Sequence, residues 1–203
     1  MTMSSATTNK TIAILHGDIT AIAADAIVNS ANETLLPGGG VSGAIHQAAG
    51  PTVAKVCTDY YHTHGEQTAG TVIPTPAGKL SAQYILHAIG PRWQDGHHNE
   101  AKDLAQTYQN IIQSADKLGL KSVSIPAISV GIFAFPLDAA TKIALNTLTK
   151  TLQKSQYVRT VLLVCFNQEI TQTYTHISAS IATPRQIQII SLSPGYATNN
   201  QSN

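Results

Sequence analysis

Charged residues are scarce in this sequence, and neither sign is in excess. Only 11% of its 203 residues are charged, and 12 Lys and Arg against 11 Asp and Glu give a formal net charge of +1. Non-specific binding to nucleic acid requires a basic surface that neutralises phosphates. The composition therefore gives no indication of a nucleic-acid polymer as a partner, whereas a single nucleotide derivative stays among the candidate ligands.

Cysteine and long apolar runs are scarce as well. The only two cysteines, Cys57 and Cys165, are far apart in the chain, and we interpret both as reduced core thiols of an intracellular protein. No run approaches the roughly 18 to 20 apolar residues of a membrane span, and residues 1–10 lack the apolar centre of a signal peptide. We therefore expect a soluble, cytoplasmic protein with no membrane partner.

The hydrophobic content of 43% is sufficient for one sizeable core. Strand-like and helix-like patterns alternate over residues 11–182, and a Pro-Ala-Gly-Lys turn at 76–79 joins two of the strands as an antiparallel hairpin. This alternation predicts an α/β fold with helices on both faces of a mixed sheet. Residues 1–10 form a polar N-terminal segment, and 183–203 a polar C-terminal tail in which Gln186 to Leu192 resembles a weak edge strand.

The most informative stretch runs from Asn29 to Gly50. Three adjacent glycines, at positions 38–40, precede a helical pattern that begins at Val41. Glycines let the backbone approach a ligand closely, and a helix N-terminus offers unpaired N–H groups and a favourable dipole to an anion. Because the stretch contains no lysine or arginine, a phosphate bound here would be held by backbone amides.

Four segments leave the ends of predicted strands and open into loops. They are residues 16–18, 29–40, 129–136 and 165–167. Ligands of layered α/β folds bind at the carboxyl ends of strands, so we expect these four segments to share one rim of the sheet. Two loops with free amides, one carboxylate and two aromatic rings suit a nucleoside diphosphate derivative.

Five stretches of the sequence together form a recognisable pattern. They are Gly17-Asp18-Ile19-Thr20, Asp25 to Asn32, Gly38 to Pro51, His87 to Trp93 and Ile125 to Phe133. Through them, and over roughly residues 11 to 180, the sequence resembles the macrodomain family, whose members bind ADP-ribose, and it is most similar to the MacroD-like branch. The resemblance implies a three-layer α/β/α fold, and hydrolysis of ester-linked ADP-ribose (O-acetyl-ADP-ribose, or acidic side chains of mono-ADP-ribosylated proteins) without a metal or other cofactor.

The resemblance also implies roles for individual residues. Asp18 would accept a hydrogen bond from the adenine amino group, and Phe166 would flank the ring. Asn32 and Ser42 are the implied catalytic residues, at the distal ribose near the scissile bond. The implied ligand-binding residues are Asp18, Ile19, Asn32, Gly38, Gly39, Gly40, Val41, Ser42, Ser129, Val130, Gly131, Ile132, Phe133 and Phe166.

Two positions depart from the family pattern. Ser42 stands where MacroD-like hydrolases usually have aspartate, and a serine hydroxyl is a far weaker base at neutral pH. A non-catalytic ADP-ribose reader is therefore the alternative to a hydrolase. Ala134 stands where many relatives have glycine, at a cost of about 1 kcal/mol if the position requires positive φ.

Other motifs are weaker. The glycines at 38, 40 and 43 satisfy the dinucleotide-binding spacing but lie several residues after the strand, and residues 127–131 approximate a nucleophile elbow that is followed by an apolar loop rather than a helix. The histidine pairs at 62/64 and 97/98 lack cysteine or acid at tetrahedral spacing, so we interpret them as surface loop residues and expect no metal site.

Overall fold

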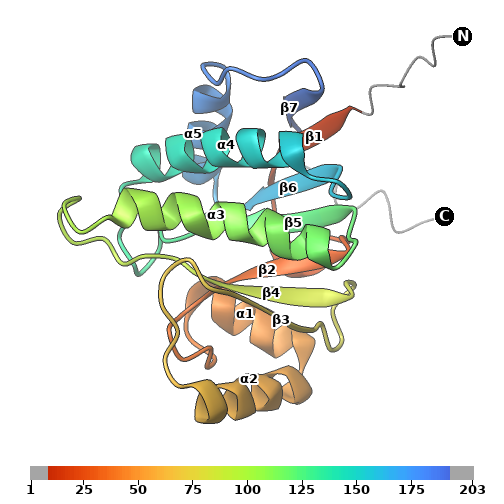
Figure 1. Cartoon of the computed structure of the whole chain (residues 1–203), viewed down its shortest axis with the longest axis vertical. Helices are drawn as coiled ribbons and strands as arrows, with labels where there is room; N and C mark the ends of the chain where they lie inside the picture. The colour runs from red at the N-terminus through yellow and green to blue at the C-terminus, as the bar shows by residue number, and fades with distance from the viewer. Residues whose placement is uncertain (1–8, 193–203) are drawn as a thin grey trace, which may run out of the picture.

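The protein folds around one seven-stranded sheet, seen in a computed structural model that describes residues 9–192 (Figure 1). The strand order is β3-β4-β2-β5-β6-β1-β7, and every neighbouring pair is parallel except the β3–β4 hairpin. The expected mixed sheet is confirmed. The strands are β1 Lys10–His16, β2 Ala26–Ala31, β3 Val72–Pro76, β4 Tyr84–Ile89, β5 Ser122–Pro126, β6 Thr160–Cys165 and β7 Ile187–Ser191.

Helices cover both faces of the sheet, which confirms the three-layer arrangement. Alternate side chains of a strand point to opposite faces, and in β1 this sends Ile12 and Ile14 into the core beneath α3, α4 and α5, and Leu15 into the core beneath α1 and α2. A short 3₁₀ turn, Ile19–Ala21, follows β1. The helices are α1 Gly40–Ala49, α2 Pro51–His64, α3 Glu100–Lys117, α4 Leu137–Lys154 and α5 Gln168–Ser178.

Both cysteines are free and buried, as expected. Burial raises the pKa of Cys57 to about 11 and that of Cys165 to about 12, so both thiols stay protonated at neutral pH. None of the helices within residues 9–192 is long and apolar enough to cross a membrane.

The sheet extends beyond the predicted boundary at residue 182. Strand β7 pairs in parallel with β1, from Lys10 opposite Ile187 to Ile14 opposite Ser191. Without β7 the β1 strand would leave a row of unpaired backbone groups at the edge, and this pairing outweighs the polar composition that indicated a tail. Lys10, predicted in the N-terminal segment, opens β1. Residues 1–8 and 193–203, which make up the rest of both predicted segments, lie outside the described residues.

The N-terminus of helix α3 is organised by Glu100 and not by a side-chain cap from Asn99. Asn99 is at the cap position, but its backbone is left-handed (φ 67°) and its side chain makes no capping bond. The carboxylate of Glu100 turns back and accepts hydrogen bonds from the N–H groups of residues 94–96 and of His98. Burial alone would raise the pKa of Glu100, but these backbone hydrogen bonds together outweigh it and lower the pKa to about 2.

Glu100 is therefore expected to make the free energy of unfolding depend on pH. Its pKa in the folded protein, about 2, is below the value of about 4.3 in an unfolded chain, so its stabilisation is present above that value and is lost as the pH falls toward 2. Denaturant titrations across this range should show a smaller loss for Glu100→Gln than for the wild type. Glu66→Gln, at an exposed carboxylate, is the control, and equal losses in all three proteins would contradict the expectation.

Candidate active site

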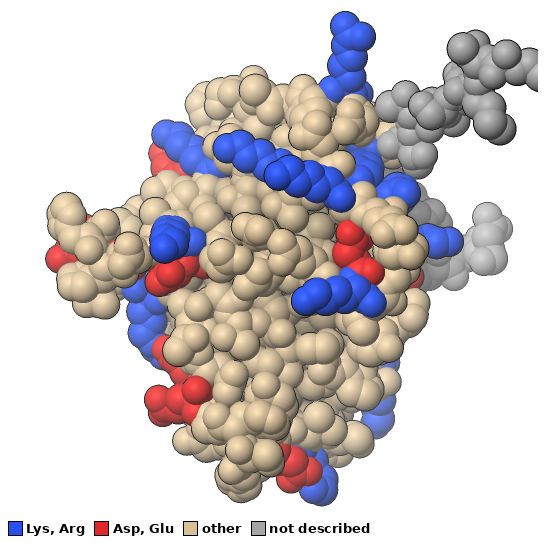
Figure 2. Space-filling view, viewed as in Figure 1, with Lys and Arg blue, Asp and Glu red and all other residues tan. Residues whose placement is uncertain are grey.

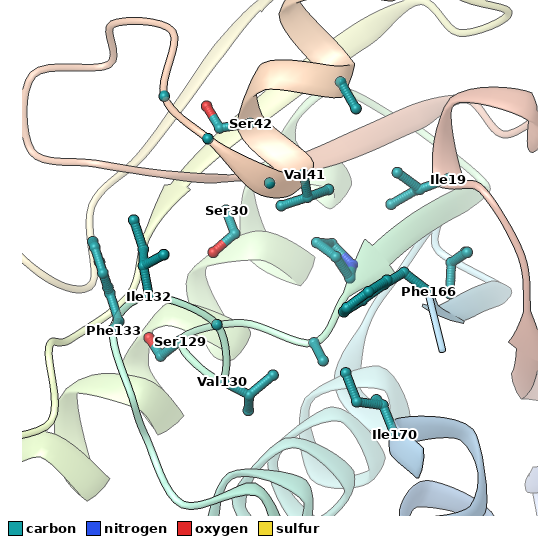
Figure 3. A pocket seen from close by; sticks show the side chains of 18 of the residues that line it. Ile19, Ser30, Val41, Ser42, Ser129, Val130, Ile132, Phe133, Phe166 and Ile170 are labelled. Carbon is teal, nitrogen blue, oxygen red and sulfur yellow. The ribbon is translucent and has the colours of Figure 1, made fainter. Parts of the chain in front are cut away.

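The carboxyl ends of four adjacent strands, β1, β2, β5 and β6, border one pocket with a volume of about 650 Å³ (Figure 3). All fourteen residues implied as ligand-binding line it. The prediction that these strand ends share one rim of the sheet is therefore confirmed. The role of each residue in binding stays a proposal. The further lining residues are His16, Gly17, Ser30, Ala44, Pro126, Ala127, Val164 and Ile170.

Three of these additional lining residues carry a signal in the sequence that the motif reasoning did not use. Ser30 precedes Asn32 by two positions, and Val164 precedes Phe166 by two, which is the spacing at which strand residues face the same side. Ile170 lies in the first turn of α5, three residues beyond the end of the predicted 165–167 segment. Strand alternation at the carboxyl ends would have found the first two.

The glycine loop forms one wall of the pocket. Within the described part of the chain, the backbone N–H groups of residues 38–42 donate no hydrogen bond. Gly40 has a left-handed backbone (φ 58°), and a Cβ at Gly43 would lie only 2.6 Å from the Gly38 carbonyl oxygen. Glycine at these two positions lets the loop fold tightly onto α1 and leaves a row of amide donors at the helix N-terminus.

The Ser129 loop, residues 129–133, forms the facing wall (Figure 3). It is closed by hydrogen bonds from the Ala134 N–H to the Gly131 oxygen and from the Phe135 N–H to the Ser129 oxygen, at 2.8 and 2.9 Å. None of the N–H groups of residues 129–133 donates a hydrogen bond to another described residue. Ser129 and Ala134 both have positive φ (66° and 55°), so the expected strain at Ala134 is present, at about 1 kcal/mol.

One end of the pocket is apolar with a single carboxylate. Phe166 is 75% exposed at the rim, and Ile19 and Ile170 lie near it (Figure 3). The Oδ1 atom of Asp18 accepts hydrogen bonds from the Thr20 N–H and hydroxyl at 2.9 and 2.8 Å. Its Oδ2 atom bonds no described residue, so one oxygen is left for a ligand. An aromatic wall beside a free acceptor suits a planar ring that carries an amino group.

Asn32 lies at the other end and holds its own loop together. Its Oδ1 atom accepts from the Thr34 N–H and hydroxyl at 3.2 and 2.9 Å, and its Nδ2 atom donates to the Leu36 carbonyl at 3.1 Å. These bonds occupy the oxygen but only one of the two amide protons. Asn32 therefore keeps one N–H for a ligand while its other bonds fix the direction of that N–H.

Arg92 ties the two loops together at the rim, a role that sequence reasoning missed. Its guanidinium donates to both Glu33 oxygens, at 2.8 and 3.1 Å, and its central carbon lies 4.0 Å from the centre of the Phe133 ring. The hydrogen bonds from Arg92 lower the pKa of Glu33. Trp93 packs against Phe135. No local signal could have linked Glu33 to Arg92, because the two are 59 positions apart.

The pocket contains no lysine or arginine among its lining residues. On the face shown in Figure 2, basic side chains lie singly or in small groups, some beside acidic ones, with wide uncharged areas between them. An anion in this pocket would therefore be bound by backbone amides, as the sequence predicted.

The histidine pairs and the alternative motifs lie apart from the pocket or lack the geometry that they would need. The structure does bring His98 beside two acids, Asp95 and Glu100, in a group that could hold a metal ion, so acids lie closer to this histidine than we expected. His62 and His64 are exposed, but in the last turn of α2 rather than in a loop, whereas His97 and His98 are exposed in a loop as expected. Asp59, which a dinucleotide site would need near a strand end, is on α2 and pairs with Lys55. The predicted elbow leads into a loop, and α4 begins only at Leu137.

Fold and pocket together define an α/β domain with a ligand site at its strand ends. The Macro domain family model matches residues 28–144. The chain belongs to the macro domain family.

Named relatives agree with this assignment. The chain is 41% identical over 169 residues to an O-acetyl-ADP-ribose deacetylase of Citrobacter rodentium, covering 83% of this chain and 96% of the relative. It is 43% identical over 160 residues to O-acetyl-ADP-ribose deacetylase 1 of Pantoea vagans, covering 79% and 94%.

Solved structures agree as well. An Oceanobacillus iheyensis macrodomain with ADP superimposes with a TM-score of 0.77 at 35% identity, covering 82% of this chain and 90% of that one. A Trypanosoma brucei macrodomain in complex with ADP-ribose gives 0.74 at 34% identity, covering 82% and 68%.

Proposed function

We propose that this protein binds ADP-ribose in the pocket and hydrolyses the acetyl ester of O-acetyl-ADP-ribose. The observation that carries the proposal is the pair of facing loops, residues 38–42 and 129–133, whose backbone N–H groups bond no other described residue. Two such rows suit the two phosphates of a nucleoside diphosphate. The deacetylase relatives and the ADP-ribose complex of the trypanosome macrodomain support the choice of ligand.

The two ends of the pocket set the direction of the ligand. The adenine ring would lie against Phe166, with its amino group donating to Asp18. The pyrophosphate would lie between the loops, and the distal ribose would reach Asn32 and Ser42. A volume of about 650 Å³ is within the usual range for a site that encloses a ligand of this size.

Hydrolysis would proceed by attack of water on the ester carbonyl. The carbon–oxygen bond to the ribose breaks, acetate leaves, and the ribose oxygen takes up a proton. Neither Asn32 nor Ser42 is a strong base, so a phosphate oxygen of the bound substrate would accept the proton of the attacking water. Asn32 would orient the ribose with its free N–H. Of the residues that line the pocket, only Asp18 carries a carboxylate and only His16 an imidazole, and none carries a thiol. The His46, Cys57 and His87 group, which could hold a metal ion, is buried outside that lining.

Removal of the Asn32 amide tests the catalytic claim. Asn32→Ala should reduce release of acetate from O-acetyl-ADP-ribose on the order of 10²-fold, because a misplaced ribose carries its ester away from the attacking water. Calorimetric titration with ADP-ribose should show a much smaller loss of affinity. Asn146→Ala, on the exposed face of α4, is the matched control. Release by the wild type no faster than by Asn32→Ala would contradict the hydrolase proposal.

The alternative function is a reader that binds ADP-ribose without cleaving it. The replacement of the usual acid by Ser42 is the observation that favours it. Tight ADP-ribose binding with no release, from either O-acetyl-ADP-ribose or a protein mono-ADP-ribosylated on acidic side chains, would identify a reader. Absence of ADP-ribose binding would overturn both functions. The cytoplasmic location expected from the sequence stays a prediction.

A further inference from the structure

A line of buried polar side chains leads from the core to Ser42. Asn29 on β2 and His87 on β4 lie directly opposite each other in the parallel pairing, and both are fully buried. The Nδ2 atom of Asn29 lies 3.1 Å from His87 Nδ1 and 3.5 Å from Ser42 Oγ. On its far side, His87 Nε2 lies 3.0 Å from the Thr75 hydroxyl and 3.6 Å from Cys57 Sγ.

The donor and the acceptor of each hydrogen bond along this line can be assigned. An amide nitrogen only donates, so His87 Nδ1 accepts from Asn29 and the ring proton is on Nε2, where it faces Thr75. Burial, with a smaller contribution from nearby His46, lowers the pKa of His87 to about 3, so the ring is neutral at working pH. The second amide proton of Asn29 is then directed at Ser42 Oγ.

The opposite orientation of the Asn29 amide is less favourable. In the observed orientation the one buried Asn29 atom without a partner among the described residues is its oxygen, Oδ1. Turning the amide over would leave the NH₂ group in that place, and an unpaired buried N–H is costlier and rarer than an under-satisfied oxygen. Asn29 therefore donates to Ser42 and does not accept from it.

Ser42 is left with a hydroxyl proton that no described residue accepts. Its hydroxyl accepts from Asn29, and among the described residues it donates to none. Ser42 is 6% exposed and is one of the residues that line the pocket, beside the glycine loop (Figure 3). An aspartate here would also accept from Asn29, but it would present only acceptor oxygens to the ligand. Serine and aspartate at this position therefore offer opposite polarity to the same ligand group.

We propose that Asn29 and His87 are positioning residues that hold the Ser42 hydroxyl as a hydrogen-bond donor to the ester carbonyl of the substrate. This inference rests on the proposed function. During attack by water the carbonyl oxygen gains negative charge, and a donor fixed toward it stabilises that charge. When the tetrahedral intermediate collapses, the bond to the ribose oxygen breaks and the carbonyl re-forms. Ser42 donates throughout and neither takes up nor loses a proton.

A double-mutant cycle on hydrolysis tests the coupling, and the affinity for ADP-ribose is measured as a control. Ser42→Ala should lower kcat for O-acetyl-ADP-ribose roughly 10- to 100-fold with a smaller effect on KM, because a donor that acts mainly in the transition state is lost. Ser42→Thr, which keeps a hydroxyl, should retain most of the rate. Asn29→Ala should cause a similar loss in the wild type but less than a roughly threefold further loss in the Ser42→Ala background, because the two residues act as a unit.

A second variant distinguishes loss of the hydrogen-bond donor from loss of the fold. Asn29→Asp keeps the shape of the side chain and offers His87 a charged partner, but its oxygens accept, so the Ser42 proton should turn into the core. We expect it to lose as much kcat as Ser42→Ala while denaturant titration shows a cooperative fold.

The outcomes separate the two proposals. If the wild type hydrolyses its substrate and the losses at Asn29 and Ser42 simply add, the positioning role is overturned and the proposed function stands. If the wild type binds ADP-ribose without hydrolysis, the hydrolase function fails and the donor role of Ser42 toward the ester carbonyl is overturned with it. ADP-ribose carries no ester, so its affinity serves as the control that the variants still bind the nucleotide.

Discussion

Replacement of Gly90 by alanine is expected to weaken ADP-ribose binding on the order of 10²-fold. Gly90 follows β4 and lies directly against the Ser129 loop. A Cβ at residue 90 would overlap with Ser129 Oγ and lie 2.6 Å from Ile128 Cγ2, so the loop must shift to admit it. Because we propose that this loop binds the pyrophosphate through main-chain N–H groups, the shift should misdirect several donors at once. Calorimetric titration with ADP-ribose measures the effect.

The cause of this loss can be tested by rescue. Ser129→Gly in the Gly90→Ala background removes the overlapping hydroxyl and relieves the positive φ of residue 129, so it should restore a large part of the affinity. Ala88→Gly, at a buried position of the same strand, controls for a general loss of stability. A folded Gly90→Ala protein with unchanged affinity would show that the Ser129 loop does not hold the diphosphate.

The second large effect is expected for Phe166→Ala. Stacking of a base on an aromatic ring contributes about 1–3 kcal/mol, which corresponds to a roughly 5- to 150-fold rise in the Kd for ADP-ribose. The ring is 75% exposed, so the free energy of unfolding should change little. Tyr157→Ala removes another exposed aromatic ring, one that does not line the pocket, and should leave the Kd unchanged. Equal affinities in all three proteins would place the adenine elsewhere.

Much of the fold could be predicted because its determinants are local. Hydrophobic periodicity indicated each helix and strand, and turn residues marked the hairpin between β3 and β4. The strand ends then indicated the pocket, because parallel strands bring their carboxyl ends to one edge whatever their order. The prediction was weakest for strand β7, because its polar composition indicated a tail. The better indicator was the unpaired edge of β1, with which β7 pairs.

The interactions that the sequence did not reveal join residues far apart in the chain. Glu33 meets Arg92 only after two loops have reached the same rim. Asn29 meets His87 because β2 and β4 pair directly although β3 comes between them in sequence. Glu100 is the exception, because the N–H groups that its carboxylate accepts from lie only two to six positions before it in the chain. In the first two cases the chemistry depends on a register that no local pattern encodes.

The amide-lined walls have a consequence for how this family diversifies. Main-chain N–H groups are supplied by almost any sequence, so in the proposed site the diphosphate is recognised by the path of the backbone, which the absence of a Cβ at Gly43 and Gly90 permits. Neighbouring side chains would then vary without loss of the ligand. On the proposed function, relatives that differ at position 42 would keep a similar affinity for the nucleotide and differ mainly in the rate at which they hydrolyse the ester.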